Sequence, residues 1–158
     1  SLRRRQRQMC IRDSFYGVPS CHMLYSIQKG DFVLMNIIEL LGLKTTLLSA
    51  EKTIVEVRVS EKLMQPYGIV HGGINALLAE TAASLGANEC LPDNLVPVGV
   101  SIHTSHLKAV TQGILVATAT PVNIGHSLQV WSVSIHEKST DMLTSTSTVT
   151  IKNQILKK

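Results

Sequence analysis

Most of the information in this sequence lies in one segment, Gln65-Pro-Tyr-Gly-Ile-Val-His71-Gly-Gly-Ile-Asn-Ala-Leu-Leu-Ala-Glu80-Thr-Ala-Ala-Ser84. From residue 74 its larger apolar residues fall at helical spacing, and small residues keep the other faces slim. The pattern predicts a long central helix buried in the fold. A glutamate there is costly unless it is paired or used, because desolvation disfavours its charged form. Glu80 is therefore a candidate functional residue, and a structural ion pair or hydrogen-bonded acid is the alternative.

The segments around this helix predict a sheet. Residues 36–42 contain a possible capping pair and a closing glycine, which predicts a short helix. Thr53–Val59 alternates as a half-buried strand does. After Pro92 strand formers dominate, and turn residues divide them into strands at about 98–110, 113–123, 127–137 and 142–152. Because short turns join these strands, we expect an antiparallel meander, and one sheet curling around one helix gives an α+β fold.

Length and charge limit the class of protein. The chain has 158 residues, 44% of them hydrophobic, which suits one domain with a sizeable core. Its formal net charge is +4, and residues 1–14, with five arginines and one aspartate, account for all of it. The neutral remainder, with 4% aromatic residues overall, provides no electrostatic footprint for DNA or RNA. We therefore expect no nucleic-acid partner.

The cysteines and the hydropathy indicate a location. Cys10, Cys21 and Cys90 are odd in number and form no metal-binding spacing, which argues against a disulfide framework and a structural zinc site. No apolar run approaches the roughly 18 residues of a membrane span, and no signal-type segment is present. We expect a soluble, cytoplasmic protein without a membrane partner.

Residues 1–34 differ from the rest because they show no period of either 2 or 3.6. The first fourteen resemble translated sequencing-adapter read-through, and Met35 is a plausible true start. We expect a non-domain extension over 1–34, disordered or a gene-model artefact, followed by one domain over 35–158. The alternative is a basic tail that contacts an acidic surface.

The residues around Glu80 suggest acyl-transfer chemistry. Ser84 lies one helical turn later on the same face and can orient the carboxylate or a water. At the helix start, His71-Gly72-Gly73 offers unpaired backbone N–H groups, which the two glycines leave open to an anionic oxygen. Gln65 can bring a side-chain amide to the same place. Together these groups predict an oxyanion site.

The spacing of His71 and Glu80 predicts a dimer. Nine residues on an ideal helix correspond to half a turn after whole turns are removed, and to about 13.5 Å along the axis. The two side chains therefore cannot meet on one helix. If both act on one substrate, a second copy supplies one of them across a two-fold axis between antiparallel helices.

The segment from Gln65 to Ser84 resembles the signature of hotdog-fold acyl-CoA thioesterases. The resemblance runs from about residue 35 to 153, in the branch that contains phenylacetate-pathway, 4-hydroxybenzoyl-CoA and 1,4-dihydroxy-2-naphthoyl-CoA thioesterases. It implies a long helix wrapped by an antiparallel sheet, without metal or cofactor. It also implies that Glu80 is the nucleophile or general base, that the Gly72 N–H is the oxyanion donor, and that Gln65 and His71 hold the thioester. Ser84 stands where the family has Ser or Thr.

The resemblance also suggests contacts to coenzyme A. His106 and Lys108 near a strand end, and His126 and Ser127 at a turn, match places where relatives carry groups that bind the nucleotide; Gly73 completes the set. For Lys108 the alternative is a solvated strand-end charge, and for His126 a structural role. Trp131 and Leu128 are interpreted as core or interface packing.

These residues predict hydrolysis of an acyl-CoA thioester to free acid and coenzyme A. The dehydratase and hydratase motifs of other hotdog enzymes are absent from the sequence. Similarity favours 1,4-dihydroxy-2-naphthoyl-CoA of menaquinone biosynthesis, followed by other aromatic or medium-chain acyl-CoAs. The alternatives are an acyl-carrier-protein thioesterase and a non-catalytic acyl-CoA-binding module. Relatives usually pair dimers into tetramers, so the expected partner is the chain itself.

Overall fold

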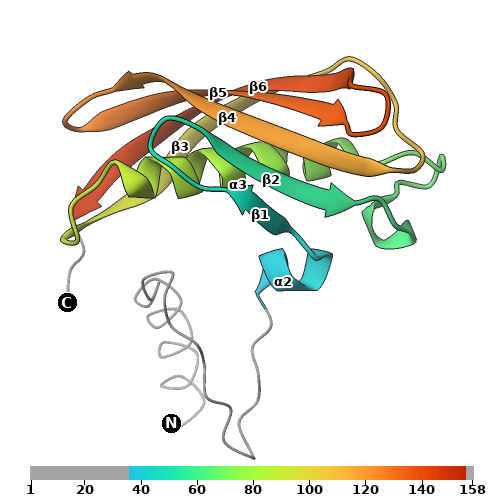
Figure 1. Cartoon of the computed structure of the whole chain (residues 1–158), viewed down its shortest axis with the longest axis horizontal. Coiled ribbons are helices and arrows are strands. Elements are labelled where there is room, and N and C mark those ends of the chain that lie inside the picture. Colours follow the sequence, from blue (N-terminus) through green and yellow to red (C-terminus); the bar gives the residue numbers. More distant parts are fainter. Residues whose placement is uncertain (1–35, 156–158) are drawn as a thin grey trace, which may run out of the picture. The chain divides into compact units, whose positions relative to one another are not determined.

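The computed structural model describes residues 36–155, and the predicted extension over residues 1–34 lies outside them. The elements run in the order α2 (Ile37–Leu41), β1 (Lys44–Leu47), β2 (Thr53–Arg58), the 3-10 helix η1 (Glu61–Leu63), α3 (Gly72–Glu89), β3 (Leu95–His106), β4 (Ile114–Ile124), β5 (Leu128–Glu137) and β6 (Met142–Ile155). A curved sheet extends over one long helix, α3 (Figure 1). This arrangement confirms the expected α+β class.

The sheet has six antiparallel strands in the order β1-β2-β4-β5-β6-β3. The predicted meander is correct for β4, β5 and β6 but wrong for β3, which pairs with β6 at the far edge. The connection between β3 and β4 is held by backbone hydrogen bonds at two points. The N–H of Leu107 donates to the carbonyl of Thr144 at 2.9 Å, and the carbonyl of Val110 accepts from the N–H of Val70 at 2.8 Å.

At the start of the described chain, the predicted short helix is confirmed as α2, whereas the strand β1 was not predicted. Asn36 Oδ1 accepts from the N–H of Glu39 at 3.0 Å, and Gly42 ends the helix in the left-handed conformation with φ of 71°. The strand β1 escaped prediction because all four of its residues are exposed, so no alternation marks it.

Small residues let α3 pack closely against the concave face of the sheet. The buried side of the helix consists of Asn75, Leu78, Ala79, Ala82, Ala83, Gly86 and Ala87. A Cβ on Gly86 would come within 2.7 Å of Trp131 Cη2 and 2.8 Å of Thr53 Oγ1. The indole of Trp131 is buried, as predicted, and its Nε1–H donates to Gln129 Oε1 at 3.0 Å. The glycine therefore makes room for the largest side chain of the core.

The turn between β5 and β6 is organised by one buried carboxylate. Glu137 Oε2 accepts from the N–H and hydroxyl of Ser139 (3.1 and 2.6 Å) and from those of Thr140 (3.0 and 2.8 Å). The hydroxyl of Ser139, followed by that of Thr140, lowers the pKa of Glu137 from 4.5 to about 2. The ionised form is therefore the one that the turn stabilises.

A pH titration of stability tests this turn. Because the folded pKa of Glu137 is depressed, its contribution is present above about pH 4.5 and is lost as the pH falls through about 2. We expect Glu137→Gln to melt below the wild type at pH 7, and the difference in Tm to shrink between pH 4.5 and 2. Thermal denaturation at several pH values measures this, and a difference that stays constant over that range would contradict it.

Candidate active site

The start of α3 presents one backbone donor where two were expected. His71 is the N-cap residue, and its Nδ1 accepts from the N–H of Gly73 at 2.9 Å. The expectation that Gly73 offers an open N–H is therefore wrong, because the imidazole takes the place of the usual capping oxygen. The N–H of Gly72 has no acceptor among residues 36–155. It is the backbone donor that remains available to a ligand.

A pocket of about 330 Å³ lies beside this donor. It brings together four predicted site residues, Gln65, Gly72, His106 and Lys108, from three segments of the chain. The turn that carries Gln65 is fixed by its own backbone, since the Gln65 N–H donates to the Ile69 carbonyl at 2.9 Å. The remaining lining residues are Ile69, Val70, Asn75, Leu107, Ala109 and Val110.

His106, the last residue of β3, lies against the start of α3. A Cβ on Gly72 would lie 2.9 Å from its Nε2 and 3.0 Å from its Cε1. On the other side of the ring, Nδ1 is 3.3 Å from Asn75 Nδ2. Asn75 was not predicted as a site residue. Its sequence signal was a polar residue three positions after Gly72, hence on the same face of the helix.

Glu80 is exposed in this chain, so the prediction that it is buried is wrong for a single copy. Its carboxylate lies against Gly99 of β3, where any Cβ would collide with Oε1. Ser84 is half-buried, and no hydrogen bond joins it to Glu80 in the described part of the chain. Apolar spacing predicted the helix correctly, but it did not distinguish the side against the sheet from the side left open.

The strand beside Glu80 has a free edge. In residues 36–155, β3 pairs only with β6, and its other edge carries no strand. Val98 and Val100 of this strand are 42% and 58% exposed, and a register shift lies between Gly99 and Ser101. Edge strands with exposed apolar residues are prone to pair with another strand.

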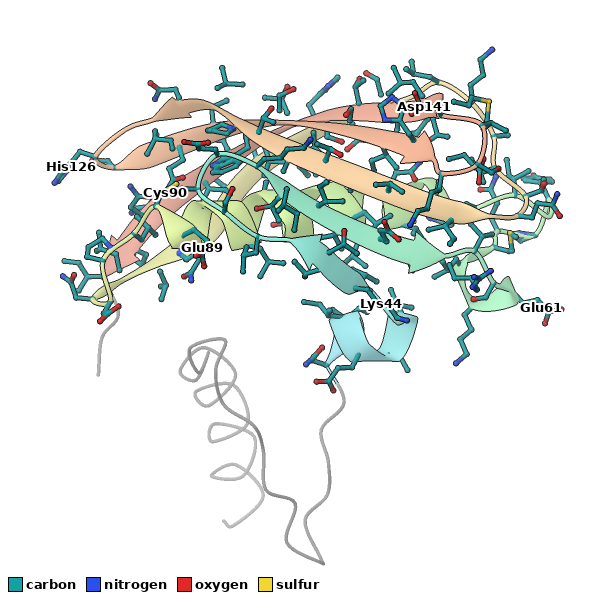
Figure 2. All side chains as sticks on the ribbon, in the orientation of Figure 1. Lys44, Glu61, Glu89, Cys90, His126 and Asp141 are labelled. Atoms are coloured by element: carbon teal, nitrogen blue, oxygen red, sulfur yellow. The ribbon has the colours of Figure 1, made fainter. Side chains whose placement is uncertain are left out.

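The remaining predicted residues lie at the other end of the protein. His126 and Ser127 are exposed at the turn between β4 and β5. The backbone carbonyl of His126 accepts a hydrogen bond from Asn153 Nδ2 at 2.9 Å. Figure 2 shows His126 at the end of the molecule where Cys90 follows α3, with Glu61 at the opposite end. Within one chain, therefore, His126 and Ser127 do not join the pocket at the start of α3.

Residues 36–155 contain neither a candidate metal-binding cluster nor a membrane-spanning helix. No group of three or more His, Cys, Asp or Glu side chains there could hold a metal ion. No helix there is long and apolar enough to cross a membrane.

The thiol of Cys90 is free and half-buried, and burial, together with the charge of Glu89, raises its pKa.

Comparisons with known proteins agree with this fold. Residues 67–143 match the family model described as the thioesterase superfamily. A 1,4-dihydroxy-2-naphthoyl-CoA hydrolase of Listeria monocytogenes is 35% identical over 109 residues, which are 69% of this chain and 89% of the relative. The 1,4-dihydroxy-2-naphthoyl-CoA thioesterase 2 of Arabidopsis thaliana is 34% identical over 128 residues, 77% and 81% of the two chains.

A solved structure is also similar to this chain. The crystal structure of a thioesterase from Haemophilus influenzae superposes with a TM-score of 0.72 and 32% identity over 77% of this chain and 84% of that one. A curved antiparallel sheet around one long helix is thus the hotdog fold of thioester hydrolases. The chain belongs to the thioesterase superfamily, and the predicted enzyme class, acyl-CoA thioesterase, is confirmed.

Proposed function

We propose that this thioesterase hydrolyses an aromatic acyl-CoA of the 1,4-dihydroxy-2-naphthoyl type, with Glu80 as nucleophile or general base. The observation that carries the proposal is the pocket that gathers Gln65, the free N–H of Gly72 and His106 at the start of α3. The names of the two relatives above support the acyl group. Other aromatic and medium-chain acyl-CoAs are the nearest alternatives.

The chemistry follows from charge development at the thioester. The carbonyl oxygen lies against the Gly72 N–H and the Gln65 amide, which stabilise it as it becomes negative. Glu80 either attacks the carbonyl carbon or removes a proton from the attacking water. The C–S bond then breaks, and coenzyme A leaves as a thiolate. Since His71 Nδ1 accepts from Gly73, the proton of the neutral ring is on Nε2, where it can donate to the substrate.

Two protomers are needed to complete this site. Glu80 does not line the pocket, and eight residues of helix put it about 12 Å along the axis from Gly72. Both Glu80 and the free edge of β3 are open in the protomer. Pairing of two β3 edges about a two-fold axis would cover them and set the α3 helices antiparallel, so that Glu80 of one chain approaches Gly72 of the other.

The same pairing of protomers would also place His126 and Ser127 near the pocket. With antiparallel helices, the end of α3 in one protomer lies near the start of α3 in its partner. His126 and Ser127 would then approach the pocket that contains His106 and Lys108 of the other chain, where the phosphates of coenzyme A need cationic or polar groups. The pairing of dimers into tetramers stays a prediction.

A mixed dimer tests the shared site. Glu80→Gln and Gly72→Pro, each inactive alone, are co-expressed with different tags and purified through both. A shared site leaves one of the two sites of each heterodimer intact, so we expect about half of the wild-type activity. If both groups act within one chain, every site is defective, and activity no higher than that of either homodimer would refute the shared site.

A thiol-release screen tests the substrate. The panel contains 1,4-dihydroxy-2-naphthoyl-CoA, benzoyl-type aromatic acyl-CoAs, medium-chain acyl-CoAs, and the same acyl groups on acyl carrier protein. We expect the highest kcat/KM for an aromatic acyl-CoA. A preference for the carrier protein would replace the substrate assignment, and binding of acyl-CoA without release of thiol would refute the enzymatic mechanism.

A further inference from the structure

We infer that Asn75 is a positioning residue that fixes the proton of His106 on Nε2, so that this imidazole presents a third hydrogen-bond donor to the thioester-binding pocket. The inference rests on the proposed function for the identity of the bound group, the carbonyl oxygen. The tautomer itself is a property of the free protein. The two parts can therefore be tested separately.

Stability alone does not explain an asparagine at this position. Asn75 is 7% exposed on a helix whose other buried residues are leucine, alanine and glycine. Its Oδ1 is buried without a hydrogen-bond partner in the described chain. Asparagine is a weaker helix former than alanine, and a buried carbonyl oxygen without a donor destabilises the fold. A residue that is unfavourable on both counts points to a role in the adjoining pocket.

The contact that Asn75 does make specifies a tautomer. Its Nδ2 lies 3.3 Å from His106 Nδ1. An amide nitrogen can only donate, so His106 Nδ1 must accept with its lone pair. A neutral imidazole carries one proton, which is then on Nε2. Among residues 36–155, no carboxylate lines this pocket; Lys108 is the other titratable side chain in its lining, and His71 caps the adjoining helix start.

The Nε2 atom of His106 lies beside Gly72, whose N–H is the proposed donor to the carbonyl oxygen. It lies 2.9 Å from the position of a Cβ on Gly72, the residue whose N–H is free. His106, Gly72 and Gln65 line the same pocket. An Nε2–H there adds to the donors that stabilise negative charge on the oxygen, whereas a bare Nε2 lone pair would repel it. The direction of the hydrogen bond between Asn75 and His106 thus decides whether His106 stabilises or destabilises negative charge on the carbonyl oxygen.

Asn75→Asp reverses this bond with almost no change in size, because a carboxylate only accepts. Long-range 1H–15N correlation spectra of histidine-labelled protein at about pH 8, where a free imidazole is neutral, distinguish the tautomers. We expect Nε2–H for His106 in the wild type and Nδ1–H in the variant, with the signal assigned by its loss in His106→Ala. A wild-type Nδ1–H form, or the same tautomer mixture in both proteins, would overturn the inference whether or not the protein hydrolyses thioesters.

Kinetics then test the effect on the reaction. We expect Asn75→Asp to lower kcat by about 10²- to 10³-fold at pH 8, the loss expected for one transition-state donor. In a His106→Ala background the same change should alter kcat by less than about 2-fold, because Asn75 acts through His106. Asn88→Asp, at an exposed position of α3, is the matched control and should leave kcat unchanged. Losses that multiply in the double variant would show that Asn75 acts by another route, and would overturn its positioning role.

Discussion

Glu80→Gln is expected to abolish thioester hydrolysis, with kcat reduced by roughly 10³-fold or more, because the amide can neither attack the carbonyl nor accept a proton from water. The side chain keeps its size and its place against Gly99. Since Glu80 is exposed and makes no hydrogen bond within the described chain, the protomer loses no internal contact. Stopped-flow or steady-state thiol release measures the effect on turnover.

Glu89→Gln is the matched control for Glu80→Gln, because Glu89 is an exposed glutamate at the end of the same helix. It should retain wild-type kcat and KM. Both variants should show the wild-type Tm and elution volume in gel filtration. Near-normal hydrolysis by Glu80→Gln or Glu80→Ala would remove Glu80 from the mechanism, whereas loss of the dimer in Glu80→Gln would assign this residue to assembly instead.

Gly72→Pro should reduce kcat by about 10²- to 10³-fold, the loss expected for one oxyanion donor, because proline lacks the N–H. The helix itself should tolerate the change. Gly72 is the first residue of α3, where proline is favoured. His71 before it has φ of −64° and ψ of 133°, an extended conformation that suits a residue preceding proline.

Gly72→Ala separates the N–H from the added bulk. Its Cβ, like that of proline, would come within 2.9 Å of His106 Nε2 and displace the ring, but the alanine keeps its N–H. The ratio of the two kcat values therefore reports the donor alone. Equal activities of the proline and alanine variants would mean that the Gly72 N–H does not stabilise the transition state.

The sequence was a good guide to the local elements and a poor one to their order in the sheet. Alternation along Thr53–Val59 and helical spacing after residue 74 both reflect burial against one neighbour, so they predicted β2 and α3. The position of β3 depends instead on its pairing with β6, a strand far along the sequence, which no local pattern encodes. The exposed strand β1 had no pattern to reveal it.

Some of the predicted site residues lie together in the structure, but their individual contacts were not predicted. Gln65 and Gly72 of the motif meet in one pocket, which His106, predicted separately as a coenzyme A contact, also lines. The motif did not reveal that His71 uses its Nδ1 to cap Gly73, or that Asn75 contacts His106. Both depend on side-chain orientation set by three-dimensional neighbours. Glu80 was singled out on the premise that it is buried, which is wrong for a single copy, and its catalytic role stays a prediction.

The pairing of β3 with β6 has a consequence for biosynthesis. The strand that carries Gly99 and His106 finds its hydrogen-bonding partner only in the last strand of the described chain. During translation, β3 therefore cannot pair until β6 has been synthesised and has left the ribosome. Long-range pairing of this kind slows folding. A nascent chain stopped before residue 142 would contain α3 and the strands β1 to β5, but its β3 would have no partner strand within the chain. The sheet that carries the candidate site should thus be complete only after β6 has emerged.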